Sequence, residues 1–530
     1  MTSKPSNDAT DHETSSANFA MHNRPSYAKD TNRILYNWSG LQYIADKSKV
    51  VHPRSEEELA SIIKRTHKVR VIGTALSYEP ISSISARPSQ DHLSNPLNPL
   101  STEDDVAVVS FQQDFIGLKS LDLNKNTATF QAATSIDDVI RILAKHGQMM
   151  TACPGVIGVQ TLAGSIATGT HGQGLYQSDY ADMVQSFRIV LADGSIRIMT
   201  PADPLFNLYL ISMGTLGIIT WVEISIRPRL LYTCTKFSCS YNQFLKDYIK
   251  WNQEAEFAKA WWFPETGTCQ VWLVNPSSEQ EVVYYHEHKV KKKTPPQSNS
   301  RYCYPSDSED VDPIEYPSEE SHTQMNQTIR DYIYAMAKDT KVSQHSGEPQ
   351  FCTLTRFMNM QTVIGWNEQL VTKGIPVPQI NCEISIPLEQ FQAATEALRD
   401  WNGANPGKLH YPFIYRVAGK SKALMSASHR GPIVWIGFLV YISQSGNIRN
   451  DGMSTMYQIQ KILAPFQGLP HWGKHYCPEL FKMAKLYTTP IWNQFCEEMR
   501  TVDPLGKLTS PFLQNLFFGP ALTTNVKSKL

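Results

Sequence analysis

The most informative segment of the chain is Thr161-Leu-Ala-Gly-Ser-Ile-Ala-Thr-Gly-Thr-His-Gly-Gln-Gly174, which holds four glycines and four hydroxyl residues in fourteen positions. A glycine-rich main chain can bring its N–H groups close to a ligand, because glycine has no Cβ atom. Ser165, Thr168 and Thr170 add hydroxyl groups to the same stretch. The segment therefore predicts a loop around an anion, with a diphosphate as the expected ligand. The Walker lysine and the GxGxxG spacing are missing, which disfavours a P-loop or Rossmann site.

Strand and helix patterns alternate on both sides of this segment. Val69–Ile72 and Thr127–Ala132 have strand composition, and the stretch from Ser135 to Lys145 has a capping serine, early acids and helical apolar spacing. Further strands are expected at 187–191, 195–199 and 217–226. The pattern predicts an α+β domain that covers residues 33–230.

The region 231–470 predicts a second α+β domain, built on an antiparallel sheet. Strands are expected at Gln270–Val274, Gln379–Ile386 and Ile433–Ile442, and a helix at Glu389–Trp401. Residues 286–325 have the composition of a disordered insertion, and residues 1–32 that of a disordered tail. Residues 471–530 form a C-terminal segment with helices.

Composition excludes several classes of protein. Lys+Arg and Asp+Glu number 49 each, so no nucleic-acid-binding surface is expected. The nine cysteines form no CxxC pair, which argues against a metal site or a disulfide framework. The longest apolar run, Pro432–Ile442, is about half as long as a bilayer crossing requires, and the first thirty residues contain no signal-peptide core. A cytoplasmic protein without a transmembrane segment is expected.

The run Ala163-Gly-Ser-Ile-Ala-Thr-Gly-Thr-His-Gly172 resembles the flavin loop of the aldonolactone and alditol oxidase family, which belongs to the vanillyl-alcohol oxidase superfamily. The resemblance implies a two-domain α+β flavoprotein in which the first domain and the C-terminal segment hold FAD, and the middle domain covers the flavin and contacts substrate. Six more blocks match in order: Asn37-Trp-Ser-Gly40, Val69-Arg-Val-Ile-Gly73, Ala192-Asp-Gly194, Met213-Gly-Thr-Leu-Gly-Ile-Ile219, Pro470-His-Trp-Gly-Lys474 and Asp503-Pro-Leu-Gly-Lys507.

The same resemblance assigns residues to the cofactor. One diphosphate loop is expected at Ile72, Gly73, Thr74, Ala75, Leu76 and Ser77, and a second at Gly164, Ser165, Thr168, Gly169, Thr170, His171 and Gly172. The adenosine end of FAD is expected at Gly214, Gly217 and Ile218. A plain β-turn is an alternative explanation for Gly214 and Gly217. His171 is expected to support the loop, and His471 to lie beneath the flavin-facing Lys474.

Two departures from the family pattern concern the flavin. Many family members attach it covalently through a histidine, and the matching position here is Leu76. Leucine has no nucleophilic atom, so the resemblance implies FAD that is bound without a covalent link there. Gly155 matches the position at which the dehydrogenase of the family carries alanine, and a glycine there leaves room for O₂. The expected enzyme is therefore an oxidase that releases hydrogen peroxide.

Other departures concern the substrate. A Glu-x-Arg pair of the family is best matched by Ile414-Tyr415-Arg416, so the arginine is kept and the carboxylate is lost. Val156 replaces a serine, and 435–439 reads Trp-Ile-Gly-Phe-Leu. Unpaired polar groups of a sugar would each cost about 1 to 3 kcal/mol against such apolar walls. A small alcohol less polar than a sugar lactone is therefore favoured as substrate.

The expected reaction is hydride transfer from a carbinol C–H to flavin N5, followed by reduction of O₂ to H₂O₂. Lys474 and Arg416 would stabilise negative charge that develops during the reaction, and the base remains open between Tyr415, His410 and Glu383. Two alternatives stay open. One is an authentic D-arabinono-1,4-lactone oxidase, and the other is a flavin-bound scaffold that performs non-redox chemistry or only binds a ligand.

Overall fold

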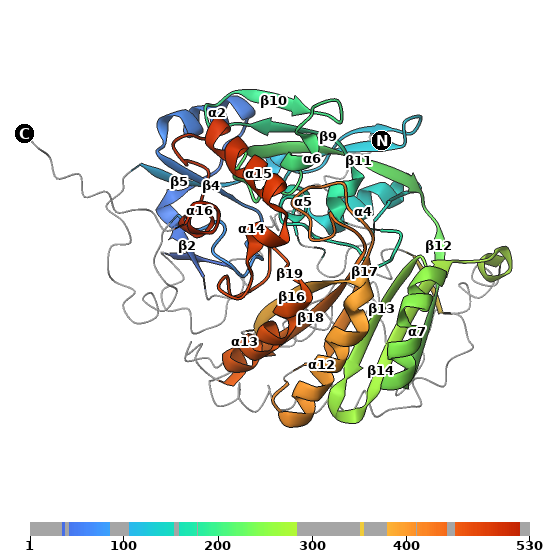
Figure 1. The fold of residues 1–530 in the computed structure, drawn as a ribbon. Coiled ribbons are helices and arrows are strands. Elements are labelled where there is room, and N and C mark those ends of the chain that lie inside the picture. Colours follow the sequence, from blue (N-terminus) through green and yellow to red (C-terminus); the bar gives the residue numbers. More distant parts are fainter. Residues whose placement is uncertain are drawn as a thin grey trace, which may run out of the picture.

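The computed structural model describes residues 34–37, 42–84, 105–152, 158, 160–177, 179–283, 350–353, 379–409, 411–441 and 451–519. The predicted tail 1–32 and insert 286–325 lie outside the described residues. Two bodies make up the described part, and the C-terminal segment crosses from the second body back to the first (Figure 1).

The first body contains three sheets. A parallel sheet has the order β3-β5-β4, a larger antiparallel sheet has the order β10-β9-β11-β7-β6 with β8 paired to β11, and β1 and β2 form an antiparallel pair. The strands are β1 (Ile34–Tyr36), β2 (Tyr43–Asp46), β3 (Val50–Val51), β4 (Lys68–Ile72), β5 (Val106–Ser110), β6 (Leu118–Asp122), β7 (Thr127–Gln131), β8 (Gln148–Met150), β9 (Val184–Val190), β10 (Ile196–Met199) and β11 (Ile218–Pro228).

Capping and amphipathic spacing explain the helices of this body. The predicted helix after Ser135 is present as α4 (Ile136–Lys145), and the Ser135 side chain accepts a hydrogen bond from Asp138 N at 3.0 Å. Its buried residues recur at helical spacing and face the sheet. The other helices are α2 (Glu56–Arg65), α5 (Leu162–Ala167) and α6 (Phe206–Tyr209).

The second body is an eight-stranded sheet in the order β15-β12-β14-β13-β17-β18-β16-β19, and all its pairings are antiparallel. Helices α7, α12 and α13 cover one face of the sheet (Figure 1). The predicted antiparallel sheet is thus confirmed. Its elements are β12 (Leu231–Ser240), α7 (Tyr241–Glu254), β13 (Phe257–Phe263), β14 (Thr268–Pro276), β15 (Gln350–Thr353), β16 (Gln379–Pro387), α12 (Phe391–Ala404), β17 (Phe413–Ala418), β18 (Ile433–Tyr441), α13 (Asp451–Leu463) and β19 (Leu469–Pro470).

The C-terminal helices α14 (Met483–Leu486), α15 (Thr489–Val502) and α16 (Pro511–Phe518) lie against the first body, so the red end of the chain meets its blue beginning (Figure 1). Lys68 Nζ donates to Gly506 O at 2.9 Å, and Lys507 Nζ donates to Ile63 O at 2.9 Å. Val69 N also donates to Lys507 O at 2.9 Å. These reciprocal bonds fasten the returning segment to α2 and β4.

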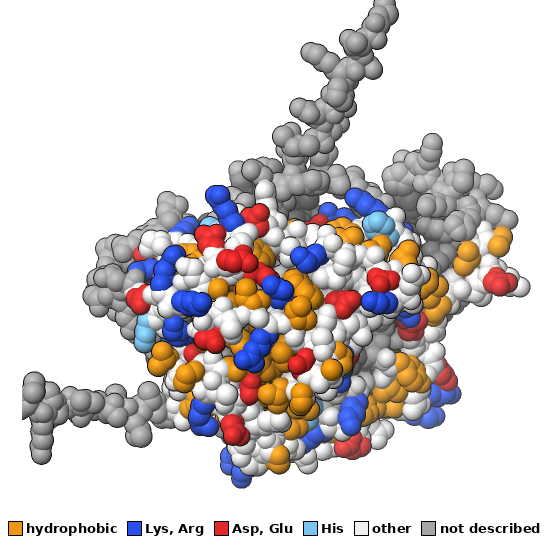
Figure 2. Space-filling model, turned by 90° about the horizontal axis from the view of Figure 1, so that it is seen from above, with side chains coloured by type: hydrophobic (Ala, Val, Ile, Leu, Met, Phe, Trp, Pro, Cys, Tyr) orange, Lys and Arg blue, Asp and Glu red, His pale blue; other side chains and the backbone are white. Residues whose placement is uncertain are grey.

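The surface carries mixed charge, as the balanced composition predicts. On the face seen in Figure 2, acidic and basic side chains are scattered among hydrophobic ones. Among the helices of the described ranges, none combines the length and the apolar character that a membrane crossing requires.

Candidate active site

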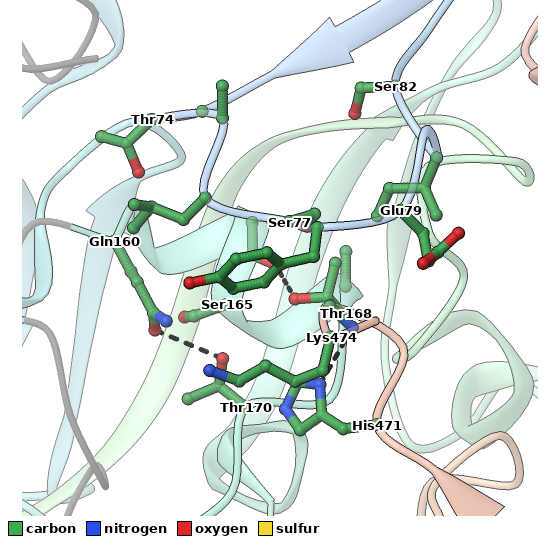
Figure 3. A pocket seen from close by; sticks show the side chains of 18 of the residues that line it. Thr74, Ser77, Glu79, Ser82, Gln160, Ser165, Thr168, Thr170, His471 and Lys474 are labelled. Atoms are coloured by element: carbon green, nitrogen blue, oxygen red, sulfur yellow. Dashed lines mark hydrogen bonds between the residues drawn. The ribbon is translucent and has the colours of Figure 1, made fainter. Parts of the chain in front are cut away.

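A cavity of about 250 Å³ lies between the two bodies. Segments that are far apart in the sequence form its wall. They are the turn after β4, the α5 segment, the stretch 212–217, the face of the large sheet that α7, α12 and α13 do not cover, and residues 471–474. Five of the seven sequence motifs therefore contribute residues to one site. Figure 3 shows the turn with Thr74, Ser77 and Glu79 above, and Lys474 and His471 reaching in from the C-terminal segment.

The turn after β4 is shaped to receive an anion. All six residues that were predicted here, 72–77, line the cavity. Ala75 has φ of +56°, a left-handed conformation that turns successive N–H groups to one side. Within the described residues, the amides of 74–77 donate to no protein acceptor. A Cβ atom added at Gly73 would collide with Thr161 Oγ1, so the two anion-binding segments approach each other as closely as glycine permits.

The glycine-rich segment forms a short helix, α5, where a loop was predicted. Leu162 and Ile166 are four residues apart and both are buried, which favours a helical turn. Ser165 Oγ donates to Leu162 O at 2.7 Å, and Thr168 Oγ1 donates to Gly164 O at 2.9 Å. The wall includes the following predicted residues: Gly164, Ser165, Thr168, Thr170 and His171.

Three predicted cofactor residues do not line the cavity. Gly169 has φ of +73°, and a Cβ atom added to it would lie against Ile211. Gly172 follows α5 and also does not line the cavity. Ile218 begins β11 and is buried in the core of the first body, because strand alternation directs it away from the cavity. Their predicted contacts with the cofactor stay predictions.

Gly214 and Gly217 line the wall, and Arg70 supports this stretch from behind. The fully buried Arg70 guanidinium donates through Nη2 to Met213 O at 2.8 Å and to Ile81 O at 2.7 Å. It thereby joins two wall segments that are more than 130 positions apart. Burial lowers the pKa of Arg70 to about 10, against the raising effect of Asp503, so the side chain stays cationic at neutral pH.

The large sheet presents two rows of side chains to the cavity. Register places Lys259, Arg416 and Trp435 side by side on β13, β17 and β18. The next row holds Trp261, Ile414, Gly437 and Glu383 on β13, β17, β18 and β16. Because Gly437 has no side chain, Glu383 reaches across β18 and forms an ion pair with Arg416 Nη2. Ile414 stands where the family's Glu-x-Arg pair has its glutamate, but Glu383 on β16 brings a carboxylate to Arg416. The predicted loss of this charge was therefore wrong.

Glu383 is the electrostatic centre of this wall. Burial alone would raise the pKa of Glu383, but Arg416, His171 and Lys474 together hold it well below its usual range. His171 Nε2 lies 3.5 Å from Glu383 Oε1, and its ring stacks on Trp435 with centroids 4.4 Å apart. Burial lowers the pKa of His171, and Glu383 opposes this effect only in part. The site therefore holds an ionised carboxylate next to a neutral imidazole at neutral pH.

The residues 471–474 supply the remaining functional groups. Lys474 Nζ lies 5.7 Å from the centre of the Tyr78 ring, and burial lowers the pKa of Lys474 while Glu383 opposes the shift. His471 Nδ1 accepts a hydrogen bond from Gly473 N at 2.9 Å, so its proton is on Nε2. Burial holds the pKa of His471 well below its usual range. Both residues line the cavity.

Tyr415 is not part of the cavity wall, although it was predicted as a catalytic residue. It alternates with Ile414 and Arg416 on β17, so its side chain points to the opposite face of the sheet. There it packs against Phe244 and Phe391 of the covering helices, with ring centroids 5.1 and 5.9 Å away. This position removes Tyr415 from the candidate bases. The predictions for Gly155, Val156 and His410 lie outside the described residues.

Several wall residues were missed by sequence reasoning. They include Gln160, Lys259, Trp261, Asn381, Tyr411 and Glu79. The alternation of Lys259 and Trp261 along β13 was a usable signal for a shared face. Glu79 was not detectable, because its partner His475 follows almost 400 residues later, with Nδ1 at 2.6 Å from Glu79 Oε1. Burial alone would lower the pKa of His475, but Cys477 and Glu79 raise it to about 10, which makes this a charged pair.

These features fit FAD. Within the described residues the amides of 74–77 donate to no protein acceptor, so with the close Gly73–Thr161 approach they could hold a diphosphate, and the cavity continues to Lys474. An FAD binding domain model matches residues 92–200. The fold resembles a cholesterol oxidase from Brevibacterium sterolicum, with a TM-score of 0.65, 14% sequence identity, and coverage of 92% of this chain and 97% of that one. The domain model supports FAD as the cofactor, and the solved structure shows the same fold.

A model for D-arabinono-1,4-lactone oxidase matches residues 222–516, more than half of the chain. The chain belongs to this family of the FAD-linked oxidases. It is 26% identical over 254 residues to the D-arabinono-1,4-lactone oxidase of Candida albicans, a match that covers 47% of this chain and 44% of the relative. It is 21% identical over 496 residues to the L-gulonolactone oxidase of Scyliorhinus torazame, with coverage of 91% and 98%. The match to the first of these relatives thus spans less than half of its length.

Proposed function

We propose that the chain is an FAD-dependent oxidase that oxidises the carbinol group of a small molecule and reduces O₂ to H₂O₂. The observation that carries this proposal is the convergence of both anion-binding segments with Glu383, Arg416 and Lys474 in one cavity. FAD would bind without a covalent link between the 72–77 turn and the 161–171 segment, and it would accept the hydride and reduce O₂.

The residues of this chain would orient the substrate and control its proton. Arg416 would donate to the substrate oxygen from one side, and Lys474 would supply positive charge from the other. Glu383 is the candidate base within the described wall, and its low pKa makes it a weak proton acceptor by itself. We therefore propose that Glu383 acts together with His171, whose Nε2 lies 3.5 Å from it.

The wall supports two classes of substrate. Trp261, Ile414 and Leu439 line the part opposite the cofactor segments and favour a substrate with an apolar carbon skeleton. The Glu383–Arg416 pair favours the second candidate, an aldonolactone, because it restores a carboxylate and a guanidinium for sugar hydroxyls. We place the less polar alcohol first, since the apolar residues leave fewer partners for the remaining hydroxyl groups of a sugar.

An oxygen-uptake screen of the flavin-loaded protein tests this proposal. The panel compares D-arabinono-1,4-lactone and L-gulono-1,4-lactone with benzyl alcohol and cyclohexanol, and peroxide is measured in parallel. We expect peroxide formation with at least one apolar alcohol at a kcat/KM about tenfold above that for either lactone. A higher kcat/KM for a lactone selects the second candidate. Flavin that is reduced by no alcohol or lactone under anaerobic conditions contradicts both.

A further inference from the structure

Two cysteines are direct neighbours in the large sheet. Cys239 on β12 and Cys269 on β14 are opposite each other in the antiparallel pairing of these strands, and both are free thiols. Side chains of such a pair share one face of the sheet, and their Cα atoms are about 4.5 or 5.5 Å apart. A disulfide bond spans a Cα separation of about 4.4 to 6.8 Å. Either spacing therefore allows a bond between the two cysteines without a shift of the strands.

The pair lies on the face of the sheet that the helices cover. Cys269 is also opposite Trp262 of β13, so the two share a face. The ring of Trp262 lies 5.0 Å from that of Tyr241, the first residue of α7, measured between ring centres. Trp262 alternates along β13 with Trp261, which lines the cavity. A reaction at the two cysteines therefore takes place on the side of the sheet that faces away from the cavity.

The two thiols differ in exposure and in acidity. Cys239 is partly exposed, and Cys269 is fully buried. A hydrogen bond with Cys269 lowers the pKa of Cys239, and the backbone N–H of Phe244 in α7 adds to this effect, although burial and Asp247 oppose it. Burial raises the pKa of Cys269 well above its usual range, and Cys239 adds to that shift. Because the thiolate is the reactive form, Cys239 is the nucleophile of the pair.

We propose that Cys239 and Cys269 are an oxidation site, at which a hydroperoxide converts the two thiols into a disulfide bond. An accessible thiol of lowered pKa next to a second cysteine is the arrangement that redox-responsive cysteines share. H₂O₂ is the product of the oxidase proposed above, and peroxide from another source reacts in the same way. The disulfide bond therefore forms whether or not the chain is an oxidase.

The oxidation takes place in two steps. The Cys239 thiolate attacks one oxygen of H₂O₂, so that an S–O bond forms and the O–O bond breaks. The hydroxide that leaves takes up the proton that Cys239 had released, which gives water and a sulfenic acid. The sulfur of Cys269 then attacks the sulfur of Cys239, and the thiol proton of Cys269 leaves with the hydroxyl group as a second water. The two thiols together lose two electrons, and H₂O₂ gains them.

Peptide mapping of the full, flavin-loaded protein tests the proposal. The folded protein is treated with H₂O₂, its remaining thiols are blocked with iodoacetamide, and it is digested with trypsin without a reductant. Cleavage after Lys236, Lys246 and Lys259 places Cys239 and Cys269 on separate peptides, neither of which contains another cysteine.

We expect both peptides to lose their iodoacetamide-labelled forms and to appear as one linked pair, two hydrogen atoms lighter than their sum. Dithiothreitol is expected to restore the separate peptides. Labelled, unlinked peptides after peroxide treatment overturn the proposal, and so does a sulfonic acid at Cys239 without a link to Cys269.

Two variants and a control assign the roles of the two thiols. In Cys269→Ser, peroxide is expected to leave Cys239 as a sulfenic acid, which dimedone labels. In Cys239→Ser, the buried Cys269 is expected to stay unlabelled. Cys496→Ser is the matched control, because the Cys496 thiol is also buried but donates to Phe517 O, at 3.7 Å. It is expected to form the link between residues 239 and 269 as the wild type does.

Equal dimedone labelling of Cys239 in Cys269→Ser and of Cys269 in Cys239→Ser contradicts the assigned roles. The melting temperature of each variant before peroxide treatment shows whether it is folded, and the mapping of the wild-type protein decides on the link without any variant. Oxygen uptake is measured separately. A linked pair without oxygen uptake keeps the oxidation site and removes the oxidase, and oxygen uptake without a linked pair does the reverse.

Discussion

At the scale of single residues, the site depends on side chains whose charge is set by burial. Glu383 is held ionised by its three cationic or basic neighbours, and His471 and His171 are held neutral by desolvation. Leu76 lines the cavity wall and has no nucleophilic atom that could bond to a flavin. Each of these states follows from the identity of a few neighbours.

The identity of Leu76 predicts that the flavin is released when the protein unfolds. Precipitation with trichloroacetic acid is expected to leave the yellow colour in the supernatant, because hydrogen bonds and packing do not survive denaturation. Absorbance at the flavin bands of both fractions measures this directly. Flavin that stays with the pellet would show a covalent link at another residue.

Asp179 predicts a dependence of stability on pH. Burial raises the pKa of Asp179 to about 8, with a further contribution from Asp182, although Ser426 and Ser421 oppose the shift. The unfolded chain loses this proton near the ordinary pKa of 3.8, so the folded state loses stability as the pH rises from about 4 to about 8. Over this pH range the free energy of unfolding of Asp179→Asn is expected to fall by a few kcal/mol less than that of the wild type, on the basis of about 1.4 kcal/mol per pKa unit.

Urea unfolding of wild type and variant at pH 5 and pH 8 measures this difference. Asp114→Asn is the control, because Asp114 is exposed. Equal loss of stability in wild type and Asp179→Asn over this pH range would refute the assignment to Asp179.

At the scale of elements, the ion pair between β16 and β17 exists because β18 carries a glycine between them. A Cβ at Gly437 would lie 3.5 Å from Ile414 Cβ and 3.6 Å from Glu383 Oε1, which is ordinary contact. A single methyl group therefore fits, but a branched side chain enters the path of Glu383.

Gly437→Val is accordingly expected to separate Glu383 from Arg416 and to lower kcat/KM by about 10- to 100-fold, a range typical for a displaced catalytic group. Gly437→Ala is expected to stay within about threefold of wild type. Oxygen uptake measures both, and the melting temperature shows whether the sheet is intact. Similar activity of Ala and Val variants would mean that the ion pair does not depend on this gap.

Much of this element structure was predictable, and the cavity was not. Local signals identified β18 by its apolar run and α4 by its serine cap, because both depend on neighbours in sequence. The proximity of Glu383 and Arg416 depends on strand order in the sheet, in which β18 separates β16 from β17. Tyr415 was wrongly predicted as a catalytic residue together with Arg416. Adjacent residues of a strand point to opposite faces of the sheet, so only one of the two can face the cavity.

At the scale of the whole molecule, the C-terminal segment joins the two bodies. It follows β19 of the large sheet directly, and it supplies His471 and Lys474 to the cavity and helices to the first body. Glu79 and His475 form a charged pair across this junction. The cofactor site is therefore complete only when both bodies and this segment are assembled.

Lys507→Met is expected to weaken this assembly. Lys507 Nζ donates to Ile63 O and Lys64 O, and loss of a charged hydrogen bond costs about 1.5 to 3 kcal/mol. We expect a lower melting temperature and faster loss of FAD on dilution. The exposed Lys485, changed to Met, is the control. Unchanged FAD retention in Lys507→Met would show that the segment is held by its apolar contacts alone.

The reciprocal lysine bonds also set an order of events during synthesis. Lys68 and Gly506, which bond directly, are separated by 438 positions in the chain. At about 5 to 20 residues per second, a ribosome needs roughly 20 to 90 seconds to make the intervening chain. For most of that interval the nascent first body lacks Lys474 and the helices α14, α15 and α16. The cavity wall, which includes Lys474, is therefore complete only after nearly the whole chain has been made, and we expect FAD to bind after that point.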